Sequence, residues 1–566
     1  MLLGSVSFCV ACKGDGSSGS GTSFLEVVET SPENGREDVP VELRIAVRVS
    51  EVIDPATLTN QTFFLTDEDG AVVPSTVNVL DEPNAAPSEL GTAALLEPDE
   101  PLTIITNFTV TLTTGLRSTN GTGLEEDYDW TFKTLDSAWG ESEWIEPLGA
   151  WSSSRQEIAV DEQLNAIAVW QLEDGARSDI YANRYTRIDL WGEPEPIDDG
   201  NGGATNPKLA VDGDGNGFAV WERRDADTSD RHIWANHYDV ADGSWGVPAL
   251  LQNGDVTRAR IPSVAANSAG SATAIWVQDN LDTGRQVIRA IRYEPEAGWG
   301  ASVTIGSPTT FIAAGRIAVG MDDQGNAIAV WDPPAGPAGQ GGRVLWANRY
   351  TPESGWGEAV PIKSDETTSA NDFRMDVGTN GDAVVIWIQG NGDEAQPRDD
   401  VWASRFSGDA WSAPARIDRH DGGHKRAPDV AVDGAGIGYA VWSQVDPDFA
   451  NIWAAQYAPG LGWGAPELVE PPTEDPTDNE DASTPRVDVN RAGNAFVVWR
   501  QNWDQQGSIW SNRLDPGTSW MTAELIEDIP ATASLPIIAV DDARHAHALW
   551  LHTNSGSPKV RTNRFE

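Results

Sequence analysis

The chain has 566 residues, 39% of them apolar and 25 of them Trp, which is a globular composition and excludes an intrinsically disordered protein. Its 87 acidic residues against 38 basic ones give a formal net charge of -49, which excludes nucleic acid and anionic lipid headgroups as direct partners because such a surface repels them. Cys9 and Cys12 are the only cysteines, so we expect no disulfide and no thiol chemistry in the folded part.

Residues 1–23 contain a short apolar run, then Ala11 and Cys12, then a Gly/Ser/Asp-rich tether. This order resembles the end of a bacterial lipoprotein signal, where a small residue precedes the cysteine that becomes lipidated. Cys9 stands where Leu is usual, and no Lys or Arg precedes the apolar run. The resemblance implies export, with a lipid on Cys12, to the outer membrane, the cell surface or the periplasm. No other stretch approaches the ~18 apolar residues of a transmembrane helix, so we expect the lipid to be the only membrane contact.

Residues 24–136 are predicted to form a small β-sandwich. Apolar or alternating segments occur at 43–50, 62–73, 107–116 and 127–135, with turn residues between them and no helical period. The order SPENG…IAVRVSEVIDPATLT…TFFLTDEDG…FTVTLTTGL…DYDWTFKT is similar to the bacterial Ig-like domain of the S-layer SbsA type. The resemblance covers the whole segment and implies a spacer or adhesion module of a surface protein, without catalysis.

Residues 137–566 contain eight copies of one pattern. A Trp closes an apolar run at positions 170, 221, 276, 331, 387, 442, 499 and 550. In the second copy, four strands with turns between them are predicted at 208–212, 217–221, 232–238 and 245–251. The first two strands of each copy are apolar on both faces, as in a sheet packed between two others. The pattern predicts an all-β chain in which these sheets are the blades of a β-propeller.

The last copy ends after its third strand, and its missing fourth strand is present at the other end of the region. Residues 139–147 align with 191–199, so that Trp139 matches Trp191 and Ile145 matches Ile197. We therefore predict that 139–147 completes the last sheet and closes an eight-bladed propeller over 137–566, because closure protects the edges that an open array would expose.

In such a propeller, the variable loops between second and third strands lie on one side, called here the loop side, and the short constant turns lie on the other, the turn side. Constant frames with variable loops present binding surfaces, so we expect the loop side to bind a glycan or a protein. We expect a Gln two residues after the Trp to begin the loop, at the rim of the channel, with acids nearby. The candidate ligand-binding residues are Gln278, Gln389, Gln444, Gln501, Asp174, Asp225 and Asp446. The structural alternatives are a Gln that caps loop backbone and an acidic surface that is merely solvated.

Two further patterns recur on the repeats. The stretch DGDGNG begins like a calcium loop with Asp212, Asp214 and Asn216, but Arg223 stands at the twelfth place, where Glu is needed. Sister copies keep the first Asp only, which indicates a turn-forming Asp, so we expect no cofactor, with calcium as the alternative. An Arg also recurs near the end of the third strand, and a residue present in most blades is usually structural, as an ion pair or a stacked guanidinium. These are Arg184, Arg349, Arg405, Arg513 and Arg564.

The repeat region resembles the broad group of bacterial repeat propellers that includes sialidase-like and lectin propellers. The likeness lies in the blade pattern and carries no catalytic residue over, and the Asp-box S-x-D-x-G-x-T-W is absent. No nucleophile elbow, phosphate loop or zinc spacing occurs either. The sequence favours a non-catalytic, monomeric recognition protein of a bacterial cell surface. A glycoside hydrolase or lyase that uses loop-side carboxylates stays open, as does a purely structural envelope component.

Overall fold

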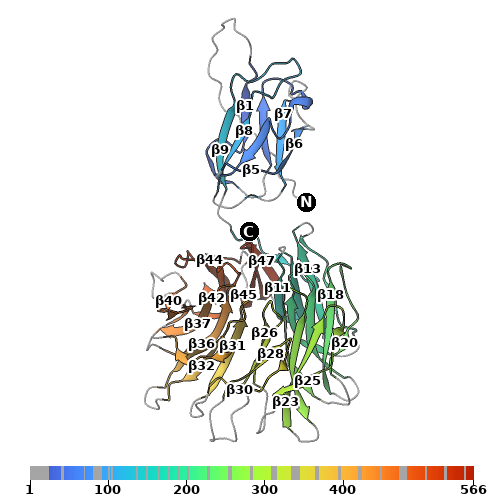
Figure 1. Ribbon diagram of the computed structural model, residues 1–566, viewed down its shortest axis with the longest axis vertical. Coiled ribbons are helices and arrows are strands. Elements are labelled where there is room, and N and C mark those ends of the chain that lie inside the picture. Colours follow the sequence, from blue (N-terminus) through green and yellow to red (C-terminus); the bar gives the residue numbers. More distant parts are fainter. Residues whose placement is uncertain are drawn as a thin grey trace. The chain divides into compact units, whose positions relative to one another are not determined.

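Figure 1 shows the chain as a computed structural model. It describes residues 24–39, 44–68, 70–80, 92–99, 102, 106–134, 138–147, 149, 151–162, 165–175, 177–187, 190–200, 203–225, 230–252, 258–280, 285–306, 315–332, 344–363, 369–392, 397–418, 423–446, 449–470, 481–503, 506–527, 529, 532–553 and 556–565. The chain divides into two compact units, Met1–Ala138 and Trp139–Glu566, which are described separately.

The first unit contains two sheets, with the strand orders β1-β3-β7-β6 and β2-β9-β8-β4-β5. Neighbouring strands are antiparallel, apart from β2 and β9, which are parallel. The elements are β1 (Val27–Ser31), β2 (Arg36–Val39), β3 (Ile45–Val49), the 3-10 turn η1 (Pro55–Thr57), β4 (Phe63–Thr66), β5 (Val72–Val73), β6 (Ser75–Leu80), β7 (Ala93–Pro98), β8 (Asn107–Leu112) and β9 (Tyr128–Thr134).

The core of this unit lies between its two sheets. Val47 of β3 belongs to one apolar cluster with Phe63, Val110 and Trp130 of the other sheet. The four predicted segments correspond to strands, but 62–73 forms two strands, β4 and β5. They are separated by a turn in which Gly70 has φ +80° and donates its N–H to the Asp67 carbonyl at 3.0 Å.

The described residues of the second unit form eight antiparallel sheets, numbered here in chain order by their first strand. Sheet 1 holds β11 (Ser152–Val160), β12 (Ala166–Glu173), β13 (Ser178–Thr186), β14 (Leu190–Trp191) and β15 (Glu195–Pro196); sheet 2 β16 (Ala204–Val211), β17 (Gly217–Arg224), β18 (Arg231–Asp239), β19 (Ser244–Trp245) and β20 (Ala249–Leu250); sheet 3 β21 (Ala259–Ala266), β22 (Ala272–Asn280), β23 (Arg285–Glu294), β24 (Gly298–Trp299) and β25 (Val303–Gly306); sheet 4 β26 (Ile317–Met321), β27 (Ala327–Trp331), β28 (Trp346–Thr351), β29 (Gly355–Trp356) and β30 (Val360–Pro361).

Sheet 5 holds β31 (Ala370–Val377), β32 (Ala383–Gly390), β33 (Asp399–Ser407), β34 (Ala410–Trp411) and β35 (Ala415–Arg416); sheet 6 β36 (Lys425–Val432), β37 (Gly438–Asp446), β38 (Phe449–Ala458), β39 (Gly462–Trp463) and β40 (Glu467–Leu468); sheet 7 β41 (Ala482–Val489), β42 (Ala495–Trp503), β43 (Gln506–Leu514) and β44 (Glu524–Leu525); sheet 8 β45 (Thr532–Val540), β46 (Ala546–Thr553), β47 (Lys559–Phe565) and β10 (Glu143–Trp144). The predicted fourth strand is two short pieces in sheets 1 to 6. In sheet 1 the Asn183 side chain donates to the Gly192 carbonyl between them at 3.0 Å.

Each boundary between consecutive sheets has its own apolar cluster, in which a Trp of one second strand packs on the second strand of its neighbour. Trp276 of β22, for example, packs with Phe218 and Val220 of β17. The eight repeated Trp side chains are at most 4% exposed. Because the two faces of a sheet are both covered in this way, its second strand is apolar on both sides, as its sequence indicated.

The repeated Arg residues are structural, as predicted. Each guanidinium lies over an aromatic ring of another sheet, a contact worth ~0.5–2 kcal/mol. The pairs are Arg184 with Tyr238 at 5.4 Å, Arg349 with Phe406 at 5.5 Å, Arg405 with Tyr457 at 5.0 Å, Arg513 with Phe565 at 5.0 Å and Arg564 with Tyr185 at 4.6 Å.

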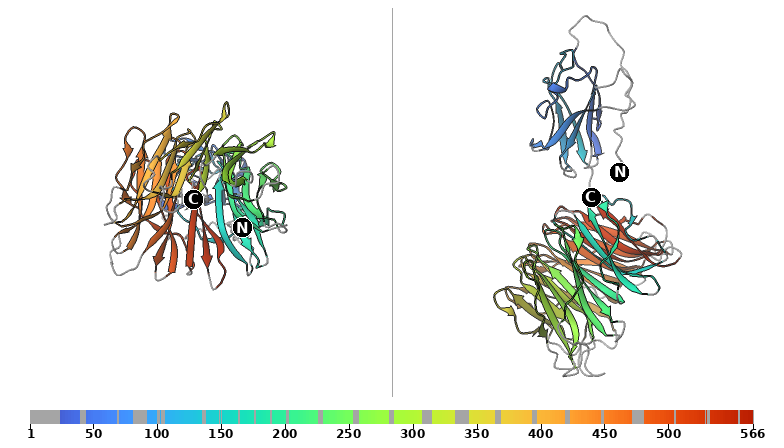
Figure 2. Two further views of the ribbon diagram at one scale, coloured as in Figure 1. Left: turned by 90° about the horizontal axis from the view of Figure 1, so that it is seen from below. Right: turned by 90° about the vertical axis from the view of Figure 1, so that its right-hand side faces the viewer.

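The last pair joins sheet 8 to sheet 1, and other contacts join the two ends of the unit as well. Strand β10 pairs with β47, with Glu143 opposite Thr562 and Trp144 opposite Arg561. Ile145 lies in one apolar cluster with Trp170 of sheet 1 and Leu549 of sheet 8. The teal and red strands lie side by side in Figures 1 and 2 accordingly. The predicted pairing of the 139–147 segment with the last sheet is therefore present.

We predict that deleting residues 139–147 destabilises the second unit, because the deletion exposes the edge of β47 and removes the buried Ile145. The expected result in thermal unfolding is a melting temperature lower by several degrees, or aggregation. Deleting an equal length of the Gly/Ser-rich segment, residues 14–22, is the matched control. An unchanged melting temperature and a monomeric 139–147 deletion would contradict the role given to β10.

Candidate functional site

A cavity of about 460 Å³ lies where the first strands of the sheets converge. Each of these strands contacts the first strands of its two neighbours, including β11 with β45. Seven of the eight sheets contribute to the wall of this space, which is called here the axial cavity. Its size lies within the ~300–1,000 Å³ of small-molecule sites. The basic residues that line it are Arg155, Lys208, Arg316, Arg374 and Arg486.

A repeated β-bulge presents these side chains, apart from Arg316 of sheet 4. In the first strands of all sheets but the fourth, the pairing register shifts at the same place, for example between Ser154 and Glu157. The first bulge residue is left-handed in each case: Arg155, Asn206, Ile261, Asp372, Ala427, Thr484 and Leu535 have φ between 47° and 59°. Bulges re-aim side chains, and here they occur at a sheet edge where no further strand pairs. They lie three or four residues into each strand, in its loop-side half.

Most of the cations in the axial cavity already have acidic partners. Lys208 is ion-paired with Glu157. Asp372 lies 2.6 Å from the Arg316 guanidinium and 3.4 Å from that of Arg374.

Two cations have neutral partners instead. The Arg155 guanidinium donates to the Asn206 side-chain oxygen at 2.8 Å, and that of Arg486 donates to the Pro485 carbonyl at 3.1 Å. Among the residues that the structure describes, neither has a carboxylate within ion-pair distance. Both guanidinium groups can therefore accept an anionic partner without breaking an ion pair, although the Arg486 charge also acts on the buried carboxyl of Asp429, where it opposes the rise in pKa that burial causes.

A layer of carboxylates lies further along the same strands, toward the turn side. Asp376 accepts the N–H of Val432 at 2.7 Å, and Asp488 accepts that of Val540 at 2.8 Å, so each ties its strand to the next sheet. Burial raises the pKa of Asp376 to about 6 and that of Asp488 to about 7. Asp429 of β36 lies nearer the loop side than these two, at the register of Arg374 and Arg486, and 3.6 Å from the Arg374 guanidinium. Burial also raises the pKa of Asp429, although Arg486 and Arg374 oppose this.

One side chain joins four sheets at the turn side. The Arg491 guanidinium lies 2.7 Å from Glu162, 3.3 Å from Asp323 and 3.4 Å from Asp542, which belong to the turns of sheets 1, 4 and 8. These ion pairs narrow that end of the axial cavity, so we infer that a ligand enters from the loop side.

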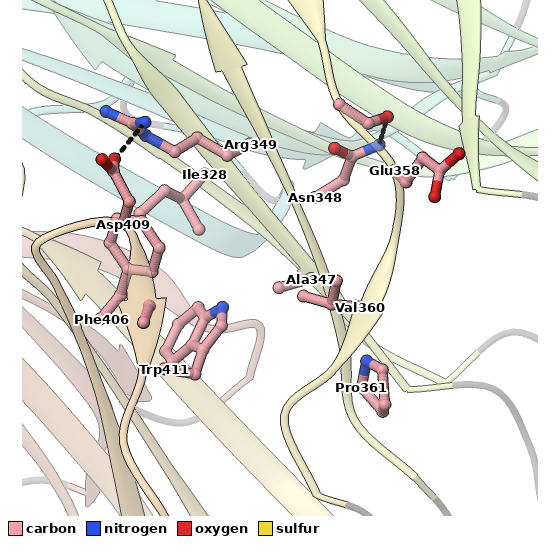
Figure 3. A pocket seen from close by; sticks show the side chains of 12 residues that line it. Ile328, Ala347, Asn348, Arg349, Glu358, Val360, Pro361, Phe406, Asp409 and Trp411 are labelled. Atoms are coloured by element: carbon pink, nitrogen blue, oxygen red, sulfur yellow. Dashed lines mark hydrogen bonds and ion pairs between the residues drawn. The ribbon is translucent and has the colours of Figure 1, made fainter.

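A second cavity, of about 410 Å³, lies between sheets 4 and 5 (Figure 3). Phe406 and Trp411 form one wall, and Arg349 is already bound to Asp409 at 2.7 Å. The Arg349 guanidinium is therefore already ion-paired within the protein, and the other residues that line this second cavity are mostly apolar.

The prediction that four Gln residues begin loops at the channel rim is wrong. All four lie within strands and are at most 8% exposed. Each accepts a hydrogen bond from the indole N–H of the Trp two residues earlier: Gln278 from Trp276 at 2.9 Å, Gln389 from Trp387 at 3.1 Å, Gln444 from Trp442 at 3.5 Å and Gln501 from Trp499 at 2.8 Å. The strands continue past the Trp, so residues two apart share one face.

The predicted acidic residues are not brought together with these Gln side chains. Asp174 accepts the N–H of Arg177 at 2.9 Å, and Asp225 donates its N–H to the Asp230 carbonyl at 2.8 Å, so both shape loop-side hairpins of their own sheets. The Asp446 side chain, Cys12 and the central parts of several variable loops lie outside the described residues.

In the candidate calcium loop, the Asp212 side chain stabilises the turn by accepting hydrogen bonds. One carboxylate oxygen accepts the N–H groups of Asp214 at 3.0 Å and of Asn216 at 2.8 Å, and the other accepts the Asn216 amide at 2.8 Å. Within the described ranges, no group of three His, Cys, Asp or Glu side chains is placed to hold a metal ion. The same ranges hold no helix long and apolar enough to cross a membrane.

Comparisons with known proteins assign only the first unit. Residues 22–134 match the family of bacterial Ig-like domains, which is typical of surface proteins. No curated protein matches the chain.

The similar solved structures include β-propellers. A protein of unknown function from Dyadobacter fermentans is 10% identical, with a TM-score of 0.38, over 76% of this chain and 99% of its own. A PL25 ulvan lyase bound to -[GlcA(1-4)Rha3S]- is 11% identical, with a TM-score of 0.43, over 68% and 97%. The β-propeller domain of the Trilobed protease from Pyrococcus furiosus is 9% identical, with a TM-score of 0.38, over 63% and 92%. At these identities and scores, no activity passes from them to this chain.

We predict that replacing Gln389, Gln444 and Gln501 together with Ala lowers the stability of the second unit. Each change leaves a buried indole N–H without its acceptor, which costs about 1–3 kcal/mol. Chemical denaturation measures the loss, and the matched control replaces each Gln with Glu, which keeps an acceptor oxygen. A triple Ala variant as stable as the parent would show that these bonds contribute nothing.

Asp488 is predicted to make stability depend on pH. Its pKa is about 7 in the folded chain and ~3.9 when unfolded, so between these values only the folded state holds the proton and stability falls as pH rises. Asp488→Asn cannot ionise and keeps an acceptor for Val540. We expect it to be more stable than the parent at pH 8, by about 1–3 kcal/mol, and equally stable at pH 4. The exposed Asp214→Asn is the control, and a gain that is equal at both pH values would refute the assignment.

Proposed function

We propose that the protein is an exported recognition protein that binds a glycan or a protein ligand without catalysis. In this proposal the eight sheets form one closed, eight-bladed propeller, monomeric and without a cofactor. The Ig-like domain, of the SbsA type, is the spacer, and a lipid on Cys12 is the anchor. Palmitate labelling that Cys12→Ala abolishes would support the anchor, and labelling that persists would reject it.

One observation carries the proposal: five basic side chains from five sheets line the axial cavity of a chain whose formal net charge is -49. Cations that line one cavity are costly to bring together, since like charges repel. Ion pairs account for three of them, and two guanidinium groups stay available to a ligand.

The variable loops around the same end support the proposal. The bulges lie in the loop-side halves of the first strands, so a ligand in the axial cavity would also meet the loops that differ from blade to blade. A rigid frame with a preformed cavity and variable surroundings is the usual arrangement of a specific binding site.

A glycoside hydrolase or lyase is the second candidate, and the raised pKa values of Asp376 and Asp488 favour it, because a carboxyl group that titrates near neutral pH can exchange protons with a substrate. Both side chains already bond backbone N–H groups of the next sheet, which supports the structural role over the catalytic one. Release of reducing or unsaturated sugar ends from a bound glycan would show that the protein is a hydrolase or a lyase.

The experiment that tests the proposal is a glycan array probed with the soluble chain from Phe24 to Glu566. We expect a restricted set of glycans to bind, and binding to fall when Arg155 and Arg486 are both replaced with Gln. A purely structural envelope component predicts no ligand. Absence of binding to every glycan, together with absence of any protein partner in surface pull-downs, would reject a recognition function.

A further inference from the structure

We propose that the axial cavity is an anion site that takes the terminal carboxylate or sulfate of an acidic sugar, held between Arg155 and Arg486. The inference rests on the proposed recognition function and names its ligand class. It depends on which cations are free, on what lies between them, and on which end of the cavity is open.

The two available guanidinium groups flank one sheet. Arg486 comes from β41 of sheet 7 and Arg155 from β11 of sheet 1, so sheet 8 lies between them. Because a guanidinium presents paired N–H donors in one plane, it binds carboxylate and sulfate oxygens in a bidentate manner. Two such groups on either side of one sheet can address one anion or two neighbouring anions of the same ligand.

Sheet 8 contributes an apolar surface between these cations. Leu535 is the left-handed bulge residue of β45, with φ 52°, and it is 51% exposed within a wall that also contains Pro536. Gln156 of β11 donates to the Leu535 carbonyl at 2.6 Å, which fixes this surface next to Arg155. An exposed Leu beside two cations suits a ligand with an apolar face and an acidic edge, as a sugar acid has.

The narrowed turn side favours a short ligand. Because Arg491 binds carboxylates of three other sheets there, we expect a polymer not to pass along the axis. About 460 Å³ holds one or two sugar residues, with the rest of a chain leaving through the loop side. The site therefore recognises a chain end.

The carboxylates beneath the site give binding a pH dependence. Asp488 lies two residues beyond Arg486 on the same strand, and the groups that face it are Asp376, Asp429 and the N–H groups of Val489 and Val540. Its protonation as pH falls through about 7 removes a negative charge next to the anion. Affinity for an acidic sugar should thus increase from pH 8 to pH 5.5.

The test titrates the full chain calorimetrically with three disaccharides: one ending in glucuronate, one ending in a hexose 6-sulfate, and neutral cellobiose. We expect an acidic probe to bind at least tenfold more tightly than cellobiose, with weaker binding at high salt. A preference between the two acidic probes identifies the carboxylate or the sulfate as the natural group.

The variant Arg155→Gln/Arg486→Gln should weaken binding of the acidic probe at least tenfold. Arg155→Gln alone changes an exposed side chain and leaves the interaction of Arg486 with Asp429 in place, so it should weaken binding with an unchanged melting temperature. As the control, Arg44→Gln removes an equal charge from an exposed Arg of the Ig-like domain and should leave the affinity unchanged. Arg155→Lys/Arg486→Lys separates charge from geometry, and partial retention of affinity is expected.

Equal affinity for cellobiose and the acidic probes, or unchanged affinity in the double Gln variant, would overturn the inference. If no acidic probe binds but the array shows a neutral glycan ligand, the anion site is rejected while the recognition function stands. If neither array nor titration shows a ligand, both are rejected.

Discussion

Every sheet of the second unit is apolar on both faces, and this constraint governs the rest of the structure. A sheet of this kind is stable only between two others, so the first and last sheets need each other. Ile145, Trp170 and Leu549 form that contact, and Arg564 stacks on Tyr185 as its sister residues do at other boundaries. The apolar packing and the Arg–aromatic stacking found between consecutive sheets thus also occur between sheets 8 and 1, which do not follow one another in the chain. This supports the closed ring that we propose.

The convergence of eight sheets also creates the chemistry at the axis. A first strand has no further partner in its own sheet, so it tolerates a bulge and a missing N–H donor. Pro207, Pro262, Pro428, Pro485 and Pro536 follow the left-handed residue in five of these strands, where Pro removes no ladder hydrogen bond. The bulges place side chains of six sheets around one cavity, sheet 4 lines it without a bulge, and the charges there differ from the acidic remainder of the chain.

The architecture could be predicted because it repeats. Eight Trp at regular spacing located the second strands, and the alignment of 139–147 with 191–199 located the pairing partner of β47. The Gln residues were wrongly predicted to begin loops because the Trp was taken as the end of the strand. The strand continues, so a Gln two residues later lies on the same face and accepts a hydrogen bond from the indole N–H. The cations of the cavity were missed because each comes from a different repeat, at one of two registers that are two residues apart. A Pro five residues before the turn Asp or Asn, as Pro207 is before Asp212, was the available signal.

The central claim is that the axial cavity, rather than the outer loops alone, holds the ligand. A crystal structure of the protein with the tightest-binding acidic disaccharide tests it most directly. The account predicts the acidic group within hydrogen-bond distance of the Arg155 and Arg486 guanidinium groups, with the sugar ring against Leu535. A ligand seated elsewhere, for example between sheets 4 and 5 beside Trp411, with water alone in the axial cavity, would contradict it.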